Sequence, residues 1–204
     1  MKKLILITFV FFNFLSIKAQ PKLYYGITAG ANISSAILPD LDINTDINAI
    51  LHGDAVAEGT PQLADFVTLY KAGVFFRLDG KIGSAKLNIN YTKSNISEEV
   101  DATAVNIEAL DLNLGYLDFD ITYNLNLFKN FYFSAGYIPS ILVNNEENLD
   151  INSFDQRLLT GIGFRFANGA TIDFNAVASI SEIIDGSYIH NIMIPITVNI
   201  PLNK

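Results

Sequence analysis

The chain contains no cysteine. It therefore has no disulfide, no zinc–cysteine site and no thiol nucleophile, and its N-terminus cannot be lipid-modified on cysteine. Basic residues are also few, with 13 against 21 acidic ones, and the formal net charge is −8. Because affinity for nucleic acid comes largely from Lys and Arg on phosphates, we expect no nucleic-acid partner. The length fits one domain.

A continuous apolar run occurs at the start of the chain. Met1-Lys2-Lys3 is a short basic segment, and residues 4–15 are apolar except for Thr8 and Asn13. Ala19 then precedes Gln20, the pattern of a secretory signal cleaved after Ala19. A spanning helix needs roughly 20 apolar residues, more than this run or any later one has. We predict a signal peptide over residues 1–19 and one domain over residues 20–204.

The remaining apolar residues recur at every second position. From Leu23 to Ile33 every odd-numbered residue is apolar, which places one set on each face of a strand. Beyond Leu114 the phase of the alternation reverses, so we expect a β-bulge near Tyr116. The same pattern predicts eight strands, over residues 23–33, 70–79, 85–92, 110–125, 131–137, 157–166, 172–180 and 192–202. Pro195 removes a ladder donor from the last of them.

The connections between these strands alternate in length. Residues 79–81, 126–130 and 167–169 are tight turns rich in Asn, Asp and Gly, whereas residues 34–69, 95–109, 144–153 and 182–187 are longer and polar. A soluble sandwich also has alternating strands, but this plan is typical of outer-membrane barrels with their tight turns in the periplasm. The sequence therefore predicts an all-β fold, an antiparallel up-and-down transmembrane β-barrel of about eight strands.

Aromatic residues on the apolar faces gather toward the two ends of the strands. Two aromatic belts around an aliphatic middle are what two membrane interfaces select. We predict as membrane-interface aromatics, toward the tight turns, Tyr25, Phe76, Tyr123, Phe131, Phe133, Phe164, Phe166 and Phe174, and toward the long loops Tyr70, Tyr91 and Tyr137.

Charged residues within the strands fall on the opposite, inward faces. Side chains nearly fill a barrel of eight strands, so we interpret these charges as a structural ion-pair network, with conduction or binding of a small solute as the alternative. The predicted lumen network contains Lys71, Arg77, Lys86, Arg157 and Arg165 against Asp118, Asp120 and Asp173.

Several short stretches spread over most of the domain share a family pattern, namely residues 25–30, 72–76, 87–92, 116–121, 133–137 and 161–164. In these stretches the chain resembles the PorT-like outer-membrane β-barrels of Bacteroidetes. The resemblance implies barrel architecture and an outer-membrane location. As partners we expect outer-membrane lipids, lipopolysaccharide and the barrel assembly machinery. These stretches contain no catalytic signature.

Other motifs support no site at this stage. Residues 40–46 are spaced like the start of a calcium loop, but Thr45 stands where Gly is wanted and Leu51 where Glu is wanted. Thr60-Pro61, followed by apolar residues 63, 66, 67 and 70, predicts a short helix. His52 and His190 are interpreted as loop or interfacial residues.

We therefore predict an envelope or interaction protein with no catalytic residue, no cofactor and no metal. Three alternatives stay open at this point. The first is a lipid-A-modifying enzyme using His190 with Ser187 and Glu182, the second a narrow pore, and the third a soluble lipocalin-like periplasmic barrel with apolar residues inside.

Overall fold

The computed structural model describes residues 21–38, 62–63, 66–98, 110–145, 151–183 and 190–203. Each long strand pairs antiparallel with the next one along the chain, and β9 pairs with β1 from Gly26↔Pro201 to Ile37↔His190. The sheet therefore closes into a barrel of eight long strands, which confirms the predicted fold class. These strands are β1 (Lys22–Leu38), β3 (Val67–Asp79), β4 (Gly83–Glu98), β5 (Leu110–Asn126), β6 (Phe131–Asn145), β7 (Phe154–Arg165), β8 (Thr171–Ser179) and β9 (His190–Pro201).

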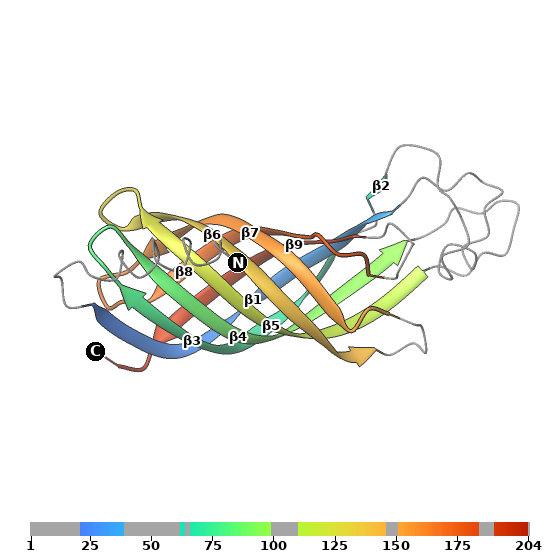
Figure 1. The fold of residues 1–204 in the computed structure, drawn as a ribbon, viewed down its shortest axis with the longest axis horizontal. Helices are drawn as coiled ribbons and strands as arrows, with labels where there is room; N and C mark the ends of the chain where they lie inside the picture. The colour runs from blue at the N-terminus through green and yellow to red at the C-terminus, as the bar shows by residue number, and fades with distance from the viewer. Residues whose placement is uncertain are drawn as a thin grey trace, which may run out of the picture.

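The barrel has two different ends (Figure 1). At one end, hereafter the turn end, β3–β4, β5–β6 and β7–β8 are joined by tight turns closed by backbone hydrogen bonds such as Gly80 N to Gly83 O, 2.8 Å. Gly169 adopts a φ of 86°, which favours glycine, and its N–H donates to the Phe166 carbonyl. The four longer connections leave from the opposite end, hereafter the loop end, as predicted. The C-terminal residues lie at the turn end (Figure 1).

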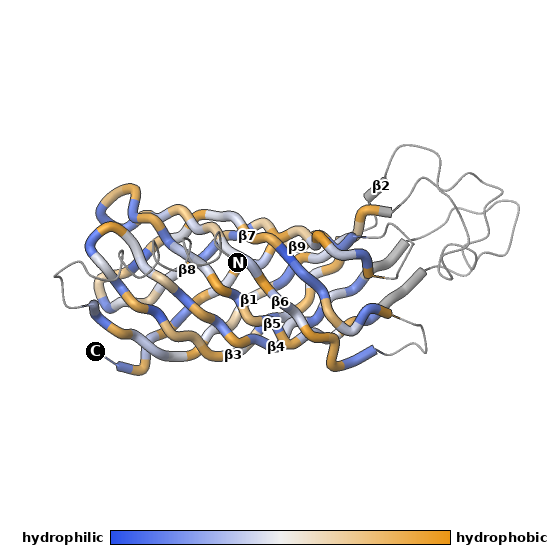
Figure 2. The backbone as a smooth tube through the Cα atoms, viewed as in Figure 1, coloured by the Kyte–Doolittle hydropathy of each residue, from blue (hydrophilic) through white to orange (hydrophobic). Residues whose placement is uncertain are grey.

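Alternating burial gives the barrel an apolar outer wall and a polar lumen. In β3, Lys71, Phe75 and Arg77 are buried, whereas Val74 and Phe76 are exposed. Hydrophobic and hydrophilic residues alternate along the other strands in the same way (Figure 2). This arrangement is the reverse of a lipocalin-like barrel, so that alternative is wrong. Among the described residues, no helix is long and apolar enough to cross a membrane.

The predicted bulge is confirmed. The register between β5 and β6 shifts between Gly115 and Tyr116, and Leu114, Gly115 and Tyr116 are all buried. The shift places the apolar side chain of Leu114 on the inner face, opposite to the outward-facing Leu117.

The predicted helix after Thr60 is wrong where the structure describes it. Gln62–Leu63 form β2, a two-residue strand that pairs with Ile37 and Leu38 of β1, and Val67 to Tyr70 begin β3. Val67 pairs with Ser34, so the ladder with β1 determines the local structure. Spacing of apolar residues that fits one helical face also fits a strand end when a neighbouring strand is available.

Two prolines interrupt the ladder without opening the barrel. Pairing between β8 and β9 is missing between Phe174↔Ile196 and Val177↔Met193, beside Pro195. Pairing between β5 and β6 is missing in the same way beside Pro139. Both gaps follow from the absent proline N–H, since the neighbouring carbonyl then has no ladder donor. Pro195 still lies in register with Asn32 of β1, so the last strand closes the barrel.

Candidate functional site in the barrel lumen

The first group of lumen charges lies toward the loop end and joins β3, β5 and β7. Lys71 Nζ lies 3.0 Å from Asp120 Oδ2 and 3.4 Å from Asp118 Oδ2. Arg157 bridges two carboxylates, with Nη1 3.0 Å from Asp118 Oδ1 and Nε 2.5 Å from Asp155 Oδ2. Two cations therefore face three carboxylates across the width of the barrel, which leaves this group with one excess negative charge.

Neutral groups complete the coordination of these carboxylates. Thr92 Oγ1 donates to Asp118 at 2.6 Å, and the Asn90 amide donates to Asp120 at 2.9 Å. Ser179 donates to Asp155 at 2.8 Å. The Arg157 guanidinium stacks on the buried ring of Tyr116, with its carbon 4.1 Å from the ring centroid. Buried carboxylates need such donors because their water is lost on folding.

The second group is a single ion pair nearer the turn end, where Lys86 is the cross-strand neighbour of Arg77. Lys86 Nζ of β4 lies 2.5 Å from Asp173 Oδ2 of β8, and their side chains are 4% and 1% exposed. The Asn199 amide donates to the same oxygen at 2.6 Å, and the Tyr132 hydroxyl donates to Asp173 Oδ1. A Cβ at Gly163, the cross-strand neighbour of Tyr132, would overlap the tyrosine ring, so glycine is needed there.

The third group lies at the turn end. Asp79 bridges two arginines, with Oδ1 2.9 Å from Arg77 Nε and Oδ2 3.4 Å from Arg165 Nη1. Arg77 Nη2 donates to the Gly169 carbonyl at 3.0 Å, and Arg165 Nη2 donates to Ser84 Oγ at 3.1 Å. Two cations therefore share one carboxylate.

The structure brings all eight of the predicted lumen charges to the interior, in three separate groups. Arg165 is the most accessible, with 21% of its side chain exposed. Two acids were missed, Asp155 and Asp79, and with them the described lumen residues include five cations and five carboxylates. Asp155 shares the alternation phase of Arg157. If the strand had been predicted to start two residues earlier, at Asp155, the alternation would have placed this carboxylate in the lumen.

Apolar side chains also pack inside the lumen. Ile138, Leu159, Val177 and Met193, from four successive strands, form a buried cluster. The amide of Asn32 on β1 donates to Met193 Sδ at 3.3 Å. The described lumen-facing groups of the first two charge groups are at most 5% exposed, as are Asn88, Asn90 and Thr92. Side chains that lined an open aqueous channel would be far more accessible, so the lumen is packed along this length.

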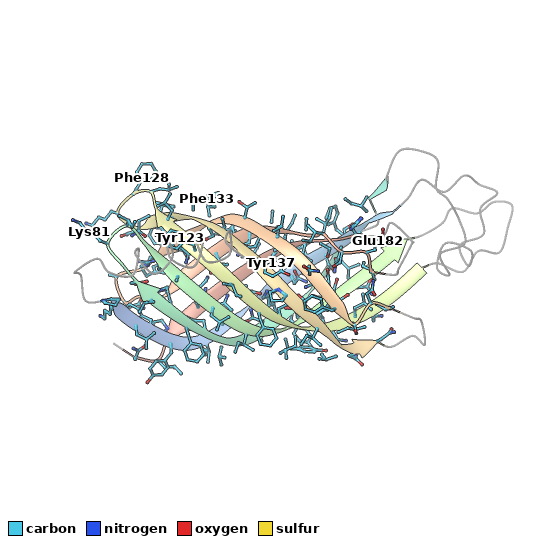
Figure 3. All side chains as sticks on the ribbon, in the orientation of Figure 1. Lys81, Tyr123, Phe128, Phe133, Tyr137 and Glu182 are labelled. Atoms are coloured by element: carbon cyan, nitrogen blue, oxygen red, sulfur yellow. The ribbon has the colours of Figure 1, made fainter. Side chains whose placement is uncertain are left out.

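The predicted interface aromatics lie on the outer wall. Tyr25, Phe76, Tyr123 and Phe133 are exposed, the last two toward the turn end (Figure 3). Phe164 stacks edge-on with Phe131 and Phe166, at 4.9 and 5.0 Å between centroids. Phe174 is exposed, and Tyr70 lies 6.1 Å from Tyr91 toward the loop end. Tyr137 donates to Gln156 at 2.8 Å.

The residues considered for catalysis or metal binding do not form a described site. His190 Nδ1 lies 3.1 Å from the carbonyl oxygen of Ser181, a contact in which the ring nitrogen donates. Ser187, His52 and residues 40–46 lie outside the described residues. Within the described ranges, no group of three His, Asp or Glu side chains is placed to hold a metal ion.

Comparison with known proteins adds little. No family model matches the chain, and a search of curated proteins finds no relative. Among solved structures, the chain is similar to Ail, the attachment invasion locus protein of Yersinia pestis, crystallised with the heparin analogue sucrose octasulfate. Identity is 10%, the TM-score is 0.46, and the match covers 87% of this chain and 97% of Ail. The resemblance to PorT-like barrels stays a prediction.

Proposed function

We propose that the protein is a small integral β-barrel of the bacterial outer membrane with a structural or interaction role and no catalytic activity. The observation that supports this proposal best is the distribution of charge and apolar surface. Outward residues such as Ile27, Ile121 and Leu158 are about half exposed, while the ionised side chains of the same strands point inward. In water such a wall would be unstable, whereas in lipid it is the expected surface.

The dimensions of the strands fit the same environment. A transmembrane β-strand needs about 9–11 residues, and the eight long strands contain 9 to 17. Closure of β1 on β9 leaves no open edge along this length, a requirement for a sheet in hydrocarbon. Exposed aromatics toward both ends fit the two interfaces.

The orientation follows from the connections. In outer-membrane barrels the tight turns face the periplasm and the longer loops face outward. On this basis the acid-rich segments 39–61, 99–109 and 146–150 are extracellular and are the parts available to a partner. Outer-membrane lipids and lipopolysaccharide contact the wall, and the assembly machinery inserts it. An export signal over residues 1–19 and kinship with PorT-like barrels belong to the same proposal.

The packed lumen opposes a conducting pore, and it predicts a measurement. In planar bilayers the purified protein should give no discrete current steps.

The lipid-A-modifying alternative is tested by mass spectrometry of lipid A. Deletion of the gene should leave the lipid A species unchanged. A species that is lost on deletion, and that His190→Ala also removes, would establish an enzyme instead.

The membrane assignment is tested by fractionation and gel mobility. The protein should be recovered with the outer membrane, and its unboiled band should migrate faster than its boiled band because the barrel resists detergent. Recovery in the soluble periplasmic fraction with no mobility shift would contradict the proposal.

A further inference from the structure

The turn end is positively charged in a chain that is acidic overall. The described residues at this end are 21–24, 77–84, 126–132, 165–170 and 201–203. They contain one acidic residue, Asp79, and five basic ones, Lys22, Arg77, Lys81, Lys129 and Arg165. Lys81 lies at the tip of its turn (Figure 3). An acidic protein thus presents a field at this end that attracts anions.

Two of the basic residues are held inside the barrel mouth. Arg77 has a fully buried side chain, and its guanidinium lies on the Tyr24 ring, 4.6 Å from the centroid. The Arg165 guanidinium lies 5.6 Å from the Tyr132 ring centroid. Aromatic faces and the carbonyl of Gly169 fix the two arginines in place, but they supply no full negative charge.

The coordination of these arginines is incomplete. Arg77 Nη1 and Arg165 Nε are buried, and neither has a hydrogen-bond partner among the residues that the structure describes. The two guanidinium groups share the single carboxylate of Asp79, so the described residues leave one positive charge at the mouth without a counter-charge. A buried charge and a buried donor without a partner are both costly, and a planar guanidinium fork fits the oxygens of an oxyanion.

We propose that Arg77 and Arg165 form a binding site for a small oxyanion of the phosphate class at the turn-end mouth. Arg165 and Asp79 are 21% and 16% exposed, whereas the Arg77 side chain is fully buried, so a solute that enters from this end meets Arg165 first. The arginines extend from the lumen faces of β3 and β7, which separates them from the headgroups of lipids around the outer wall. The site therefore takes a soluble phosphate group rather than a lipid phosphate.

The first experiment compares inorganic phosphate with chloride at equal ionic strength. The full chain, folded in zwitterionic detergent, is heated in steps, and the loss of the fast unboiled band gives the melting temperature. Phosphate should raise this temperature in a saturable way, because a ligand that binds the folded state stabilises it. No difference between phosphate and chloride would overturn the proposal. An effect of vesicles with anionic lipid in the absence of any effect of inorganic phosphate would overturn the choice of a soluble ligand.

A matched pair of variants separates the site from the general field. Arg165→Gln and Lys129→Gln remove the same charge from the same end, but Lys129 lies exposed on the β5–β6 turn. Arg165→Gln should weaken phosphate binding about ten- to hundredfold, the loss of a charge-assisted hydrogen bond. Lys129→Gln should leave the affinity unchanged within about twofold. Equal losses would mean that the lysines and arginines act only as a diffuse field.

Asp79→Asn distinguishes a binding site from a purely structural network, because only a binding site predicts that the variant is less stable and yet binds phosphate more tightly. The variant without phosphate should melt at a lower temperature, because two ion pairs are lost. Its affinity for phosphate should nevertheless rise about tenfold, because the carboxylate that competes for the two guanidiniums is gone. An unchanged or weaker affinity would overturn the proposal.

Discussion

Lys86→Met tests whether the lumen is as dry as its packing indicates. Lys86 Nζ lies 2.5 Å from Asp173 Oδ2, and both side chains are less than 5% exposed. The substitution leaves the carboxylate with hydrogen bonds from Asn199 and Tyr132 but without its cation. Removal of one partner from a buried ion pair costs about 3–5 kcal/mol, so the free energy of unfolding should fall by that amount.

The double variant Lys86→Met/Asp173→Asn distinguishes a buried charge from lost packing. In the single variant, the Asp173 carboxylate is left buried without its cation. The double variant removes this charge, while the introduced asparagine keeps the size of the original side chain. It should therefore be more stable than Lys86→Met alone, by about 1–3 kcal/mol. As a control, Lys129→Met at an exposed turn position should change the free energy of unfolding by no more than about 0.5 kcal/mol.

Equilibrium unfolding in urea, followed by circular dichroism and by the unboiled gel band, measures all three variants in the same lipid vesicles. A loss below about 1 kcal/mol for Lys86→Met would mean that water solvates Asp173 inside the barrel. The packed lumen, and with it the expected absence of conduction, would then be refuted. Conversely, current steps that appear only in Lys86→Met would show that this pair closes an otherwise open path.

Four further substitutions test the wall, the lumen packing and the ladder in the same unfolding assay. Ile121→Arg, at an exposed position within β5, should cost about 2–4 kcal/mol in lipid. Phe128→Arg, at the turn tip, should cost about 1 kcal/mol or less, and equal costs would contradict the membrane-facing wall. Gly163→Ala should cost about 1–3 kcal/mol because its methyl group meets the Tyr132 ring, and a neutral effect would show that the ring moves. Pro139→Val should raise the free energy of unfolding by about 0.5–1.5 kcal/mol, because it gives β6 an N–H that can donate to β5. A lower free energy of unfolding would mean that the rigidity of proline matters more.

Most of the fold could be predicted because its hydrophobic pattern has one period. Strict alternation identified eight strands, and the reversal of phase beyond Leu114 located the bulge. The failure after Thr60 arose where the period was ambiguous, since residues 63, 66, 67 and 70 fit one face of a helix. Pairing with β1 decided the structure there, and a distant strand leaves no mark on the local sequence.

The lumen network was predictable in membership but not in pairing. Alternation alone placed the charges inside, yet it could not show that Lys86 meets Asp173, which lies 87 residues away in the chain. That contact depends on the tilt and stagger of strands in the closed barrel. For the same reason, the shared use of Asp79 by two arginines from β3 and β7 could not be deduced before the register was known.

The charges of the chain are distributed unevenly between the connections at the two ends of the barrel. Among the described residues, five cations and five carboxylates balance within the lumen, so the net charge of −8 is carried by the rest of the chain. All the remaining acidic residues fall in residues 40–65, 98–111, 146–150 and 182–185, which belong to or adjoin the connections that leave from the loop end, while the described turn end is basic. Because the two ends carry opposite charge, they should bind different ions. Salt at 0.1 M limits the reach of each electrostatic field to about 10 Å, so binding at one end should not affect the other. Phosphate should therefore act at the turn end, and a divalent cation, if it binds this protein, should act at the loop end without altering the affinity of Arg77 and Arg165 for phosphate.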